Sequence, residues 1–360
     1  MINSTVHEKY MRRCIELASL GLGNTAPNPM VGSVIVYDNK IIGEGYHKKV
    51  GEAHAEVNAI NSVKDKSLLK KSTLYVNLEP CSHFGKTPPC ANLIAELGIP
   101  NLIIGTIDTA SHVSGKGIKI LREAGCNVIV GVLENEAREL NKRFFTFHEK
   151  KRPYIILKWA ETKDGFIDKK RESDSQKPEW ITNELSKKLV HKWRSEEQAI
   201  LVGTNTIIAD NPELTTRNWV GKNPLRIVFD RNLRLDNTYK VFNNKAETLI
   251  FADTYNKDHK NRDLMSNIGI EFVDYSKDFY AQLLNVLHKR NIQSVILEGG
   301  EKVLSSFIDT NNWDEARIFY GNMNFNEGVK APVINVKELK YENLGDVKLT
   351  FIKNSDMFNQ

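Results

Sequence analysis

An alternation of short apolar runs with helical stretches continues along almost the whole chain and restricts its fold more than any other feature. Helices placed between strands in this way predict a largely parallel sheet with helices on its faces, which is an α/β fold. A turn at Asp38-Asn39 adds one hairpin, whose second strand starts at Ile41-Ile42. In the first 150 residues the predicted strands are 31–37, 73–77, 101–105 and 127–130, and the predicted helices are 7–20, 54–62 and 90–97.

The same alternation starts again after the segment Phe144–Pro153, which mixes aromatic residues, a charge run and a proline. We interpret this segment as the end of one domain and the connector to the next. The 360 residues then form two domains, 1–150 and 151–360. In the second domain the predicted strands are 154–159, 199–202, 225–229, 248–251 and 294–297, and the predicted helices are 184–194, 279–290 and 301–308.

Composition excludes several classes of protein. Hydrophobic residues make up 41% and charged residues 26%, which is typical of a globular protein. No apolar run approaches the roughly 18 residues of a membrane helix, and the polar opening lacks the core of a secretory signal. The net charge of +5 is spread over both halves, unlike that of a dedicated nucleic-acid binder. We therefore expect a cytoplasmic enzyme with a small-molecule substrate and no nucleic-acid or membrane partner.

The strongest chemical signal is His54-Ala55-Glu56, followed by Pro80-Cys81 and then by Cys90. One imidazole and two thiolates make a three-ligand zinc site, which leaves the fourth tetrahedral position for water. Glu56 lies beside the metal without binding it, so it can move a proton between that water and a leaving amino group. This set predicts hydrolytic deamination of a heterocycle. The alternative is a structural histidine with two buried thiols.

The spacing of the cysteines departs from the general deaminase signature, H-x-E followed by P-C-x-x-C. Here eight residues, 82–89, separate Cys81 from Cys90. Two further histidines, His47 and His83, could compete as metal ligands. We expect His83 to shape the loop or to contact the substrate instead.

The segment PCSHFGKTPPC, with its long spacer, closely resembles the N-terminal domain of the bifunctional riboflavin-biosynthesis deaminase/reductase family, and so does the P-N-P-x-V-G segment from Pro27. The resemblance implies a cytidine-deaminase-like three-layer fold and Zn²⁺. It also implies that Asn28 contacts the substrate and that Lys86 and Thr87 recognise its ribosyl phosphate. Lys86 stands where the family generally has arginine, and Ala110 where it usually has asparagine, in a loop that otherwise matches at Asp108 and 115–117.

In the second half, no G-x-G-x-x-G fingerprint follows a strand. The better candidate is Leu297-Glu298-Gly299-Gly300-Glu301, where a buried strand ends in two glycines before a helix. Backbone amides at such a helix start can hold a phosphate. An ordinary glycine turn is the alternative.

This half resembles the reductase domain of the same family, through KWAETKDGFID from Lys158, the stretch 193–217 and ILEGG from Ile296. The resemblance implies a dihydrofolate-reductase-like fold that uses NADPH. Implied substrate contacts are Arg194, Leu214, Arg217 and Glu298. Implied cofactor contacts are Ala160, Trp180, Thr206, Asp210, Gly299, Gly300, Glu301, Lys302, Val303, Leu304, Ser305 and Ser306.

For some residues of this set, a structural or surface role is the alternative to cofactor or substrate binding. Trp180 could cap the core, Arg194 could be an exposed helix charge, and Asp210-Asn211-Pro212 is a good turn sequence. Pro178 stands where the family usually has a substrate-contacting serine, and the stretch 320–329 matches the family's glycine-containing turn poorly.

The leading hypothesis is a bifunctional enzyme of riboflavin biosynthesis. It would deaminate 2,5-diamino-6-ribosylamino-4-pyrimidinone 5′-phosphate and then reduce the ribosyl group to ribityl with NADPH. One alternative keeps the zinc deaminase and treats the second domain as inactive. A tRNA-editing deaminase and a non-enzymatic sensor are further alternatives. We also expect a homo-oligomer.

Overall fold

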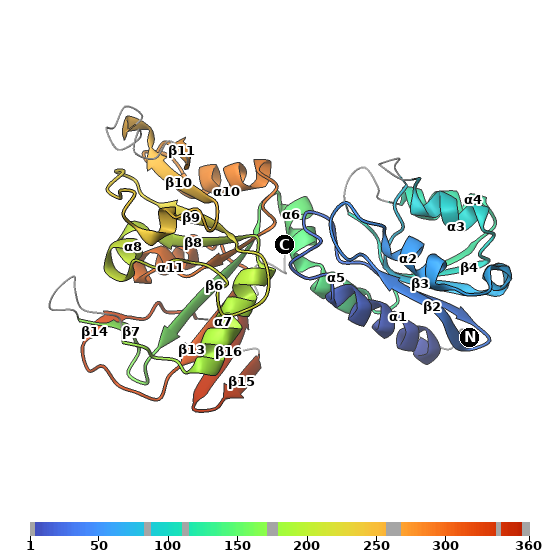
Figure 1. Cartoon of the computed structure of the whole chain (residues 1–360), viewed down its shortest axis with the longest axis horizontal. Helices are drawn as coiled ribbons and strands as arrows, with labels where there is room; N and C mark the ends of the chain where they lie inside the picture. Colours follow the sequence, from blue (N-terminus) through green and yellow to red (C-terminus); the bar gives the residue numbers. More distant parts are fainter. Residues whose placement is uncertain are drawn as a thin grey trace. The chain divides into compact units, whose positions relative to one another are not determined.

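The computed structural model describes residues 4–82, 88–109, 115–170, 179–256, 268–335 and 340–354. The chain divides into two compact units, Met1–Lys151 and Arg152–Gln360, and each is described by itself (Figure 1). The predicted α/β class is confirmed, because both units combine a sheet that contains parallel strands with helices.

The first unit is built on a five-stranded sheet with the order β2-β1-β3-β4-β5. A hairpin joins β1 to β2, β1 is also antiparallel to β3, and β3, β4 and β5 are parallel. The strands are β1 Gly32–Tyr37, β2 Lys40–Tyr46, β3 Thr73–Leu78, β4 Asn101–Thr106 and β5 Asn127–Val130. The helices are α1 Ser4–Ser19, α2 Ala55–Ser62, α3 Cys90–Glu96, α4 Lys116–Glu123, α5 Glu134–Leu140 and α6 Lys142–Lys150, with a 3₁₀ turn, η1 Lys66–Lys71.

Neighbouring residues of β1 point to opposite faces of this sheet, and each face has its own core. Val34 packs with Met11 and Cys14 of α1. Ile35 packs with Ala59 of α2 and with apolar residues of α3 and α4. The unit therefore has three layers, as predicted. Gly32 opens β1 against α1, where a Cβ would lie 2.1 Å from the carbonyl oxygen of Cys14.

The boundary between the two units falls inside the predicted segment Phe144–Pro153, most of which is helical. Residues 142–150 form α6, and only residues 151–153 separate this helix from the next strand. Phe144 and Phe145 are buried and pack with Leu78 at the end of β3. The aromatic residues belong to a helical apolar face, which the neighbouring charge run obscured in the sequence.

The second unit holds a nine-stranded sheet with the order β11-β10-β9-β8-β12-β6-β13-β16-β15. The strands from β11 to β13 in this order are parallel. Strand β16 is antiparallel to β13, and β15 is antiparallel to β16. The strands are β6 Tyr154–Glu161, β8 Ala199–Gly203, β9 Leu225–Phe229, β10 Thr248–Asp253, β11 Gly269–Val273, β12 Ser294–Leu297, β13 Glu315–Tyr320, β15 Lys340–Leu344 and β16 Val347–Lys353; β7 Phe166–Lys169 and β14 Gly328–Lys330 form a separate pair.

Helices cover both faces of this second sheet. Leu283 of α10 and Phe307 of α11 belong to one core, and Trp193 of α7 and Ile207 of α8 belong to the other. Since the central strands are parallel, the carboxyl ends of β6, β12, β8, β9 and β10 share one edge, where ligands of such sheets bind. The helices are α7 Glu184–Glu196, α8 Thr204–Asp210, α10 Phe279–Lys289 and α11 Glu301–Asp309, with 3₁₀ turns η2 Lys240–Phe242 and η3 Thr254–Asn256.

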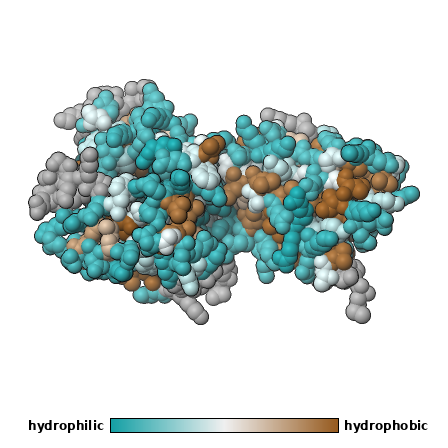
Figure 2. Space-filling view, turned by 60° about the horizontal axis from the view of Figure 1, so that its bottom comes forward, coloured by the Kyte–Doolittle hydropathy of each residue, from teal (hydrophilic) through white to brown (hydrophobic). Residues whose placement is uncertain are grey.

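The face of the molecule in Figure 2 is mostly hydrophilic, with hydrophobic areas between the hydrophilic ones. Among the described residues, no helix is both long and apolar enough to span a bilayer.

Candidate active sites

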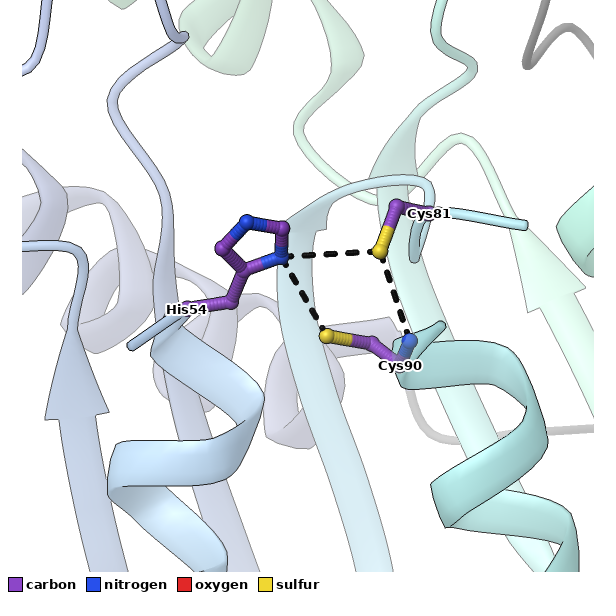
Figure 3. Close-up of side chains that lie close together, drawn as sticks. All are labelled: His54, Cys81 and Cys90. Carbon is purple, nitrogen blue, oxygen red and sulfur yellow. Dashed lines mark hydrogen bonds between the residues drawn. The ribbon is translucent and has the colours of Figure 1, made fainter. Parts of the chain in front are cut away.

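Three side chains from three elements converge at one end of the first sheet. His54 directly precedes α2, Cys81 follows β3, and Cys90 is the first residue of α3. The Nδ1 atom of His54 lies 3.5 Å from the Sγ atom of Cys81 and 3.4 Å from that of Cys90. Figure 3 shows the imidazole and both sulfur atoms turned toward one another. The structure therefore brings the predicted ligand set together.

These distances match a zinc site. Zinc binds histidine nitrogen at about 2.0–2.1 Å and cysteine sulfur at about 2.3 Å, so tetrahedral angles place nitrogen and sulfur about 3.5 Å apart. The three donor atoms of His54, Cys81 and Cys90 all lie within 4.8 Å of one another. A set of two sulfurs and one nitrogen suits zinc by its chemistry as well as by its spacing.

Glu56 lies in the first turn of α2 and is 3% exposed. Burial, together with the charge of Cys81, raises the pKa of this carboxyl group to about 7. A carboxyl group with a pKa near neutrality can both accept and release a proton at physiological pH. The arrangement therefore supplies a proton carrier next to the three ligands.

Both helix α3 and a second histidine support the ligands. The backbone N–H of Cys90, at the start of α3, donates to the Sγ atom of Cys81 at 3.3 Å, which stabilises a thiolate. His47 packs against the ring of His54, with ring centroids 5.6 Å apart. Its Nδ1 and Nε2 atoms contact Ala53 O and Asn28 Nδ2, at 3.1 and 3.2 Å. Since both nitrogens already have protein partners, His47 is not a competing metal ligand in this arrangement.

Two buried asparagines that the sequence analysis missed hold the segment that carries Asn28. The side chain of Asn141 accepts from the N–H of Met30 and donates to its carbonyl oxygen, both at 2.8 Å. Asn77 donates to the same carbonyl at 3.1 Å and accepts from the N–H of Gly32 at 2.8 Å. We call this pair the asparagine clamp. A polar residue within the buried run of β3 was the only sequence signal for it.

Glu79 joins the loop of Cys81 to the start of α4. Its carboxylate accepts from the backbone N–H groups of Gly115 and Gly117, both at 3.0 Å. A Cβ on Gly117 would lie 2.2 Å from the carbonyl oxygen of Pro80, so only glycine allows this approach. The loop that matched the family at Gly115–Gly117 is thereby tied to the metal-site loop. His83, Lys86, Thr87 and Ala110 lie outside the described residues.

In the second unit, a buried ion group forms directly after the end of β12 and beside the neighbouring strand β6. Arg194 donates from Nε and Nη2 to the two carboxylate oxygens of Glu298, at 2.9 and 2.8 Å. Lys158 adds a contact of 3.2 Å to the same carboxylate. The side chain of Arg194 is 11% exposed, so the alternative of an exposed helix charge is wrong. Burial alone would raise the pKa of Glu298, but the charges of Arg194 and Lys158 hold it below its ordinary value.

The predicted substrate loop approaches this ion group. Thr215 accepts from Nη1 of Arg194 at 3.2 Å through its carbonyl oxygen. Leu214 is buried with a positive φ of 55°, whereas Arg217 is exposed. Asn211 also has a positive φ, of 40°, and ends α8, which supports the turn interpretation of Asp210–Pro212.

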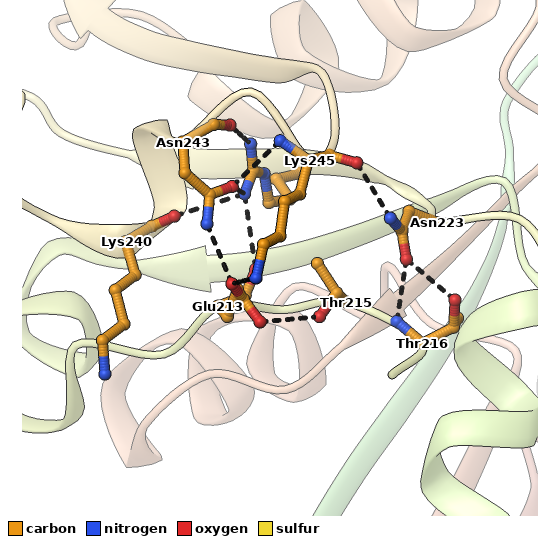
Figure 4. A network of polar contacts seen from close by, with 8 residues as sticks. Glu213, Thr215, Thr216, Asn223, Lys240, Asn243 and Lys245 are labelled. Carbon is orange, nitrogen blue, oxygen red and sulfur yellow. Dashed lines mark hydrogen bonds and ion pairs between the residues drawn. The ribbon is translucent and has the colours of Figure 1, made fainter. Parts of the chain in front are cut away.

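A network of polar contacts holds residues 213–216 of this loop (Figure 4). Glu213 contacts Lys245 at 2.6 Å and Asn243 at 3.0 Å through one carboxylate oxygen. Asn223 accepts from the backbone N–H of Thr216 at 2.9 Å. Arg226, which is fully buried, donates to the carbonyl oxygen of Glu213. None of these network residues was singled out in the sequence.

The two glycines after β12 sit beside the turn between β8 and α8. The N–H of Gly300 donates to Oγ1 of Thr206 at 3.1 Å. A Cβ on Gly203 would lie 2.9 Å from Cγ2 of Val303, and one on Gly299 would lie 3.1 Å from Cβ of Val303. The close turns place the start of the nine-residue helix α11 at the sheet edge, which is the arrangement that binds phosphate. The site therefore fits the phosphates of a nucleotide cofactor.

The other predicted cofactor residues near α11 differ in whether their side chains are accessible and in the hydrogen bonds that they already make. Leu304 is fully buried in the core, so its side chain is not available to a ligand. Lys302 is exposed, while the hydroxyl groups of Ser305 and Ser306 donate to Glu301 and to the carbonyl oxygen of Val303, both at 2.8 Å.

Ala160 and Trp180, which are also predicted cofactor residues, differ in exposure. Ala160 is half-buried near the end of β6. Trp180 is 61% exposed, so the core-cap alternative is wrong, and Nζ of Lys187 lies 4.4 Å from its ring centroid. Pro178 lies outside the described residues. The poorly matched stretch 320–329 contains the end of β13 and the start of β14, which pairs with β7.

Two family models match the chain. The cytidine and deoxycytidylate deaminase zinc-binding region matches residues 4–106, and the RibD C-terminal domain matches residues 153–325. The riboflavin biosynthesis protein RibD of Aquifex aeolicus is 38% identical, over 97% of this chain and 98% of its own length. The RibD protein of Bacillus amyloliquefaciens is 40% identical, over 88% and 84%.

Two solved structures are also similar to this chain over almost its whole length. A diaminohydroxyphosphoribosylaminopyrimidine deaminase/5-amino-6-(5-phosphoribosylamino)uracil reductase from Thermotoga maritima is similar, with a TM-score of 0.87 and 38% identity over 97% of this chain and 99% of that one. RibD of Acinetobacter baumannii has a TM-score of 0.86 and 30% identity, over 98% and 100%.

Proposed function

Because the chain belongs to the RibD family, the bifunctional deaminase/reductases of riboflavin biosynthesis, we propose which of its residues carry out each reaction. Residues 1–150 form the zinc deaminase and residues 151–360 the reductase. The substrate of the first is 2,5-diamino-6-ribosylamino-4-pyrimidinone 5′-phosphate, and the second reduces the ribosyl group of the product to ribityl with NADPH.

In the deaminase, His54, Cys81 and Cys90 hold the metal, which their common spacing supports. Zinc, when bound, lowers the pKa of a ligand water toward neutrality. Glu56 accepts the proton from the attacking water and delivers it to the amino group that leaves as ammonia, and its raised pKa suits both transfers. Asn28, oriented by His47 and by the asparagine clamp, binds the pyrimidine.

In the reductase, the backbone of residues 299–301 and the start of α11 hold the cofactor phosphates. Thr206 supports this turn through its contact with Gly300. Glu298 accepts hydrogen bonds from the substrate's ribose hydroxyl groups, while Arg194 and Lys158 hold it ionised. Exposed Arg217 binds the sugar phosphate as a fork-like cation. NADPH, when bound there, would supply the hydride that reduces C1′ of the ribose.

The observation that carries the deaminase assignment is the 3.4–3.5 Å spacing between His54 Nδ1 and the two cysteine sulfurs. One assay tests both reactions: purified, zinc-loaded protein is mixed with the pyrimidine phosphate, with and without NADPH. We expect ammonia release in both mixtures, and NADPH oxidation that follows it. Ammonia release without any NADPH oxidation would instead support a deaminase with an inactive second domain.

A further inference from the structure

One buried histidine of the second unit has no role in the reactions assigned above. His191 lies in α7, three residues before Arg194, so the two side chains are neighbours on one face of the helix. It is 4% exposed. We propose that His191 is a positioning residue of the reductase, which fixes the backbone of Thr215 and so holds the predicted substrate loop, residues 214–217, in place for the sugar phosphate. This inference rests on the proposed reductase function.

The contacts of the Thr215 backbone support this role. Thr215 is 3% exposed, and its carbonyl oxygen accepts from Nη1 of Arg194 at 3.2 Å. The imidazole of His191 also has a hydrogen bond to the backbone of Thr215. This bond uses Nε2, because Nδ1 is buried and has no hydrogen-bond partner within the part of the chain that the structure describes. Two neighbouring side chains of α7 thus hold the backbone of one residue of the substrate loop.

The backbone conformation of the substrate loop depends on such contacts. Leu214, directly before Thr215, is buried with a positive φ of 55°, which a bulky residue adopts only where its surroundings enforce it. In the network of Figure 4, Oγ1 of Thr215 donates to Glu213 at 3.2 Å, and Asn223 accepts from the N–H of Thr216 at 2.9 Å. These contacts fix the Thr215 side chain and the N–H that follows it. The carbonyl oxygen between them is held from α7.

The surroundings of His191 keep its ring uncharged. Burial lowers the pKa of this imidazole, and the positive charges of Arg194 and Arg217 lower it further, to about 4. The hydrogen bond to Thr215 and the negative charge of Glu298 act in the opposite direction with smaller effect. At neutral pH the ring therefore carries one proton, which Nε2 donates. The loop is held without a third positive charge beside the two arginines.

Two replacements of His191 separate the hydrogen bond from the filling of space. His191→Gln keeps an uncharged N–H donor at about the position of Nε2, whereas His191→Leu keeps a similar volume without a donor. Steady-state kinetics of the full-length, zinc-loaded protein are measured with the deaminated intermediate and NADPH. We expect His191→Leu to raise the KM for the intermediate about tenfold, and to change kcat and the KM for NADPH less than about twofold. His191→Gln should stay within about twofold of the unaltered protein in all three constants.

Leu284→Ala is the matched control for lost packing. Leu284 lies in α10 and belongs to the core on the other face of the sheet. We expect this variant to lower the Tm at least as much as His191→Leu and to leave the KM for the intermediate unchanged. Ammonia release should be the same in every variant.

Three results would overturn the inference while leaving the reductase assignment intact. They are an unchanged KM for the intermediate in His191→Leu, an equal rise in His191→Gln, and a rise that Leu284→Ala reproduces. If the unaltered protein failed to oxidise NADPH with the intermediate, the proposed reductase function itself would be wrong, and the role of His191 with it.

Discussion

At the scale of single residues, charge and burial decide what each polar group in the two sites can do. Glu56 and Glu298 are both buried carboxyl groups, yet their pKa values move in opposite directions. Burial raises the pKa of Glu56, while two cations outweigh the same burial effect at Glu298. Glu56 is thereby able to exchange protons near neutrality, and Glu298 stays an ionised acceptor. The same residue type thus serves two kinds of chemistry.

Replacing Glu56 by glutamine removes the proposed proton carrier but none of the proposed metal ligands. We expect Glu56→Gln to retain about one zinc per chain and to lose deamination by roughly 10²-fold or more. Metal analysis and ammonia release measure the two effects. Glu52→Gln, an exposed neighbour, is the control and should keep full activity. Undiminished turnover in Glu56→Gln would remove this residue from its role.

Replacement of Arg217 tests the reductase reaction separately from deamination. We expect Arg217→Ala to raise the KM for the deaminated intermediate about tenfold or more, because a charge-assisted contact to the sugar phosphate is lost. Ammonia release should not change. Exposed Lys222→Ala serves as the control. A parallel loss of both activities would contradict two separate sites.

At the scale of elements, distant polar residues hold the loops that carry the functional groups. The asparagine clamp joins the α5–α6 junction and β3 to the segment before β1, across 111 sequence positions in the case of Asn141 and Met30. Glu79 joins the end of β3 to the start of α4 in the same way. Such contacts are not visible as motifs, because their partners are backbone groups whose sequence carries no signal.

Asn141→Ala leaves the buried N–H and C=O groups of Met30 without one of their partners. We expect the free energy of unfolding to fall by about 1–3 kcal/mol. We also expect the KM for deamination to rise, because the segment that carries Asn28 loosens. Denaturant unfolding and steady-state kinetics measure these effects. Asn127→Ala, at the exposed first residue of β5, should change neither. Unchanged stability and KM in Asn141→Ala would show that the clamp does not hold this segment.

At the scale of the whole molecule, each unit has its own hydrophobic cores and its own set of polar site residues. The proposed metal ligands and Glu56 all belong to the unit 1–151, and the glycine turn and the ion group belong to the unit 152–360. This division predicts that the two reactions respond independently to removal of the metal.

A zinc chelator should therefore abolish ammonia release from the pyrimidine phosphate. NADPH oxidation with the deaminated intermediate should continue at its former rate. Restoring zinc should recover deamination, and mock dialysis without chelator is the control. Loss of NADPH oxidation in step with the zinc content would show that the reductase also depends on the metal.

The sequence by itself determined the α/β class, most central strands and helices, and the His54, Cys81 and Cys90 set that the structure brings together, because these depend on local periodicity and on residue types at fixed spacing. The sequence analysis did not predict helix α6, because the aromatic face of this helix is stabilised by long-range packing against Leu78. Only the tertiary structure decided that Arg194 is buried on Glu298 and that two asparagines hold Met30. These contacts join residues far apart in the chain, and their energy depends on distance and burial, which a linear sequence does not contain.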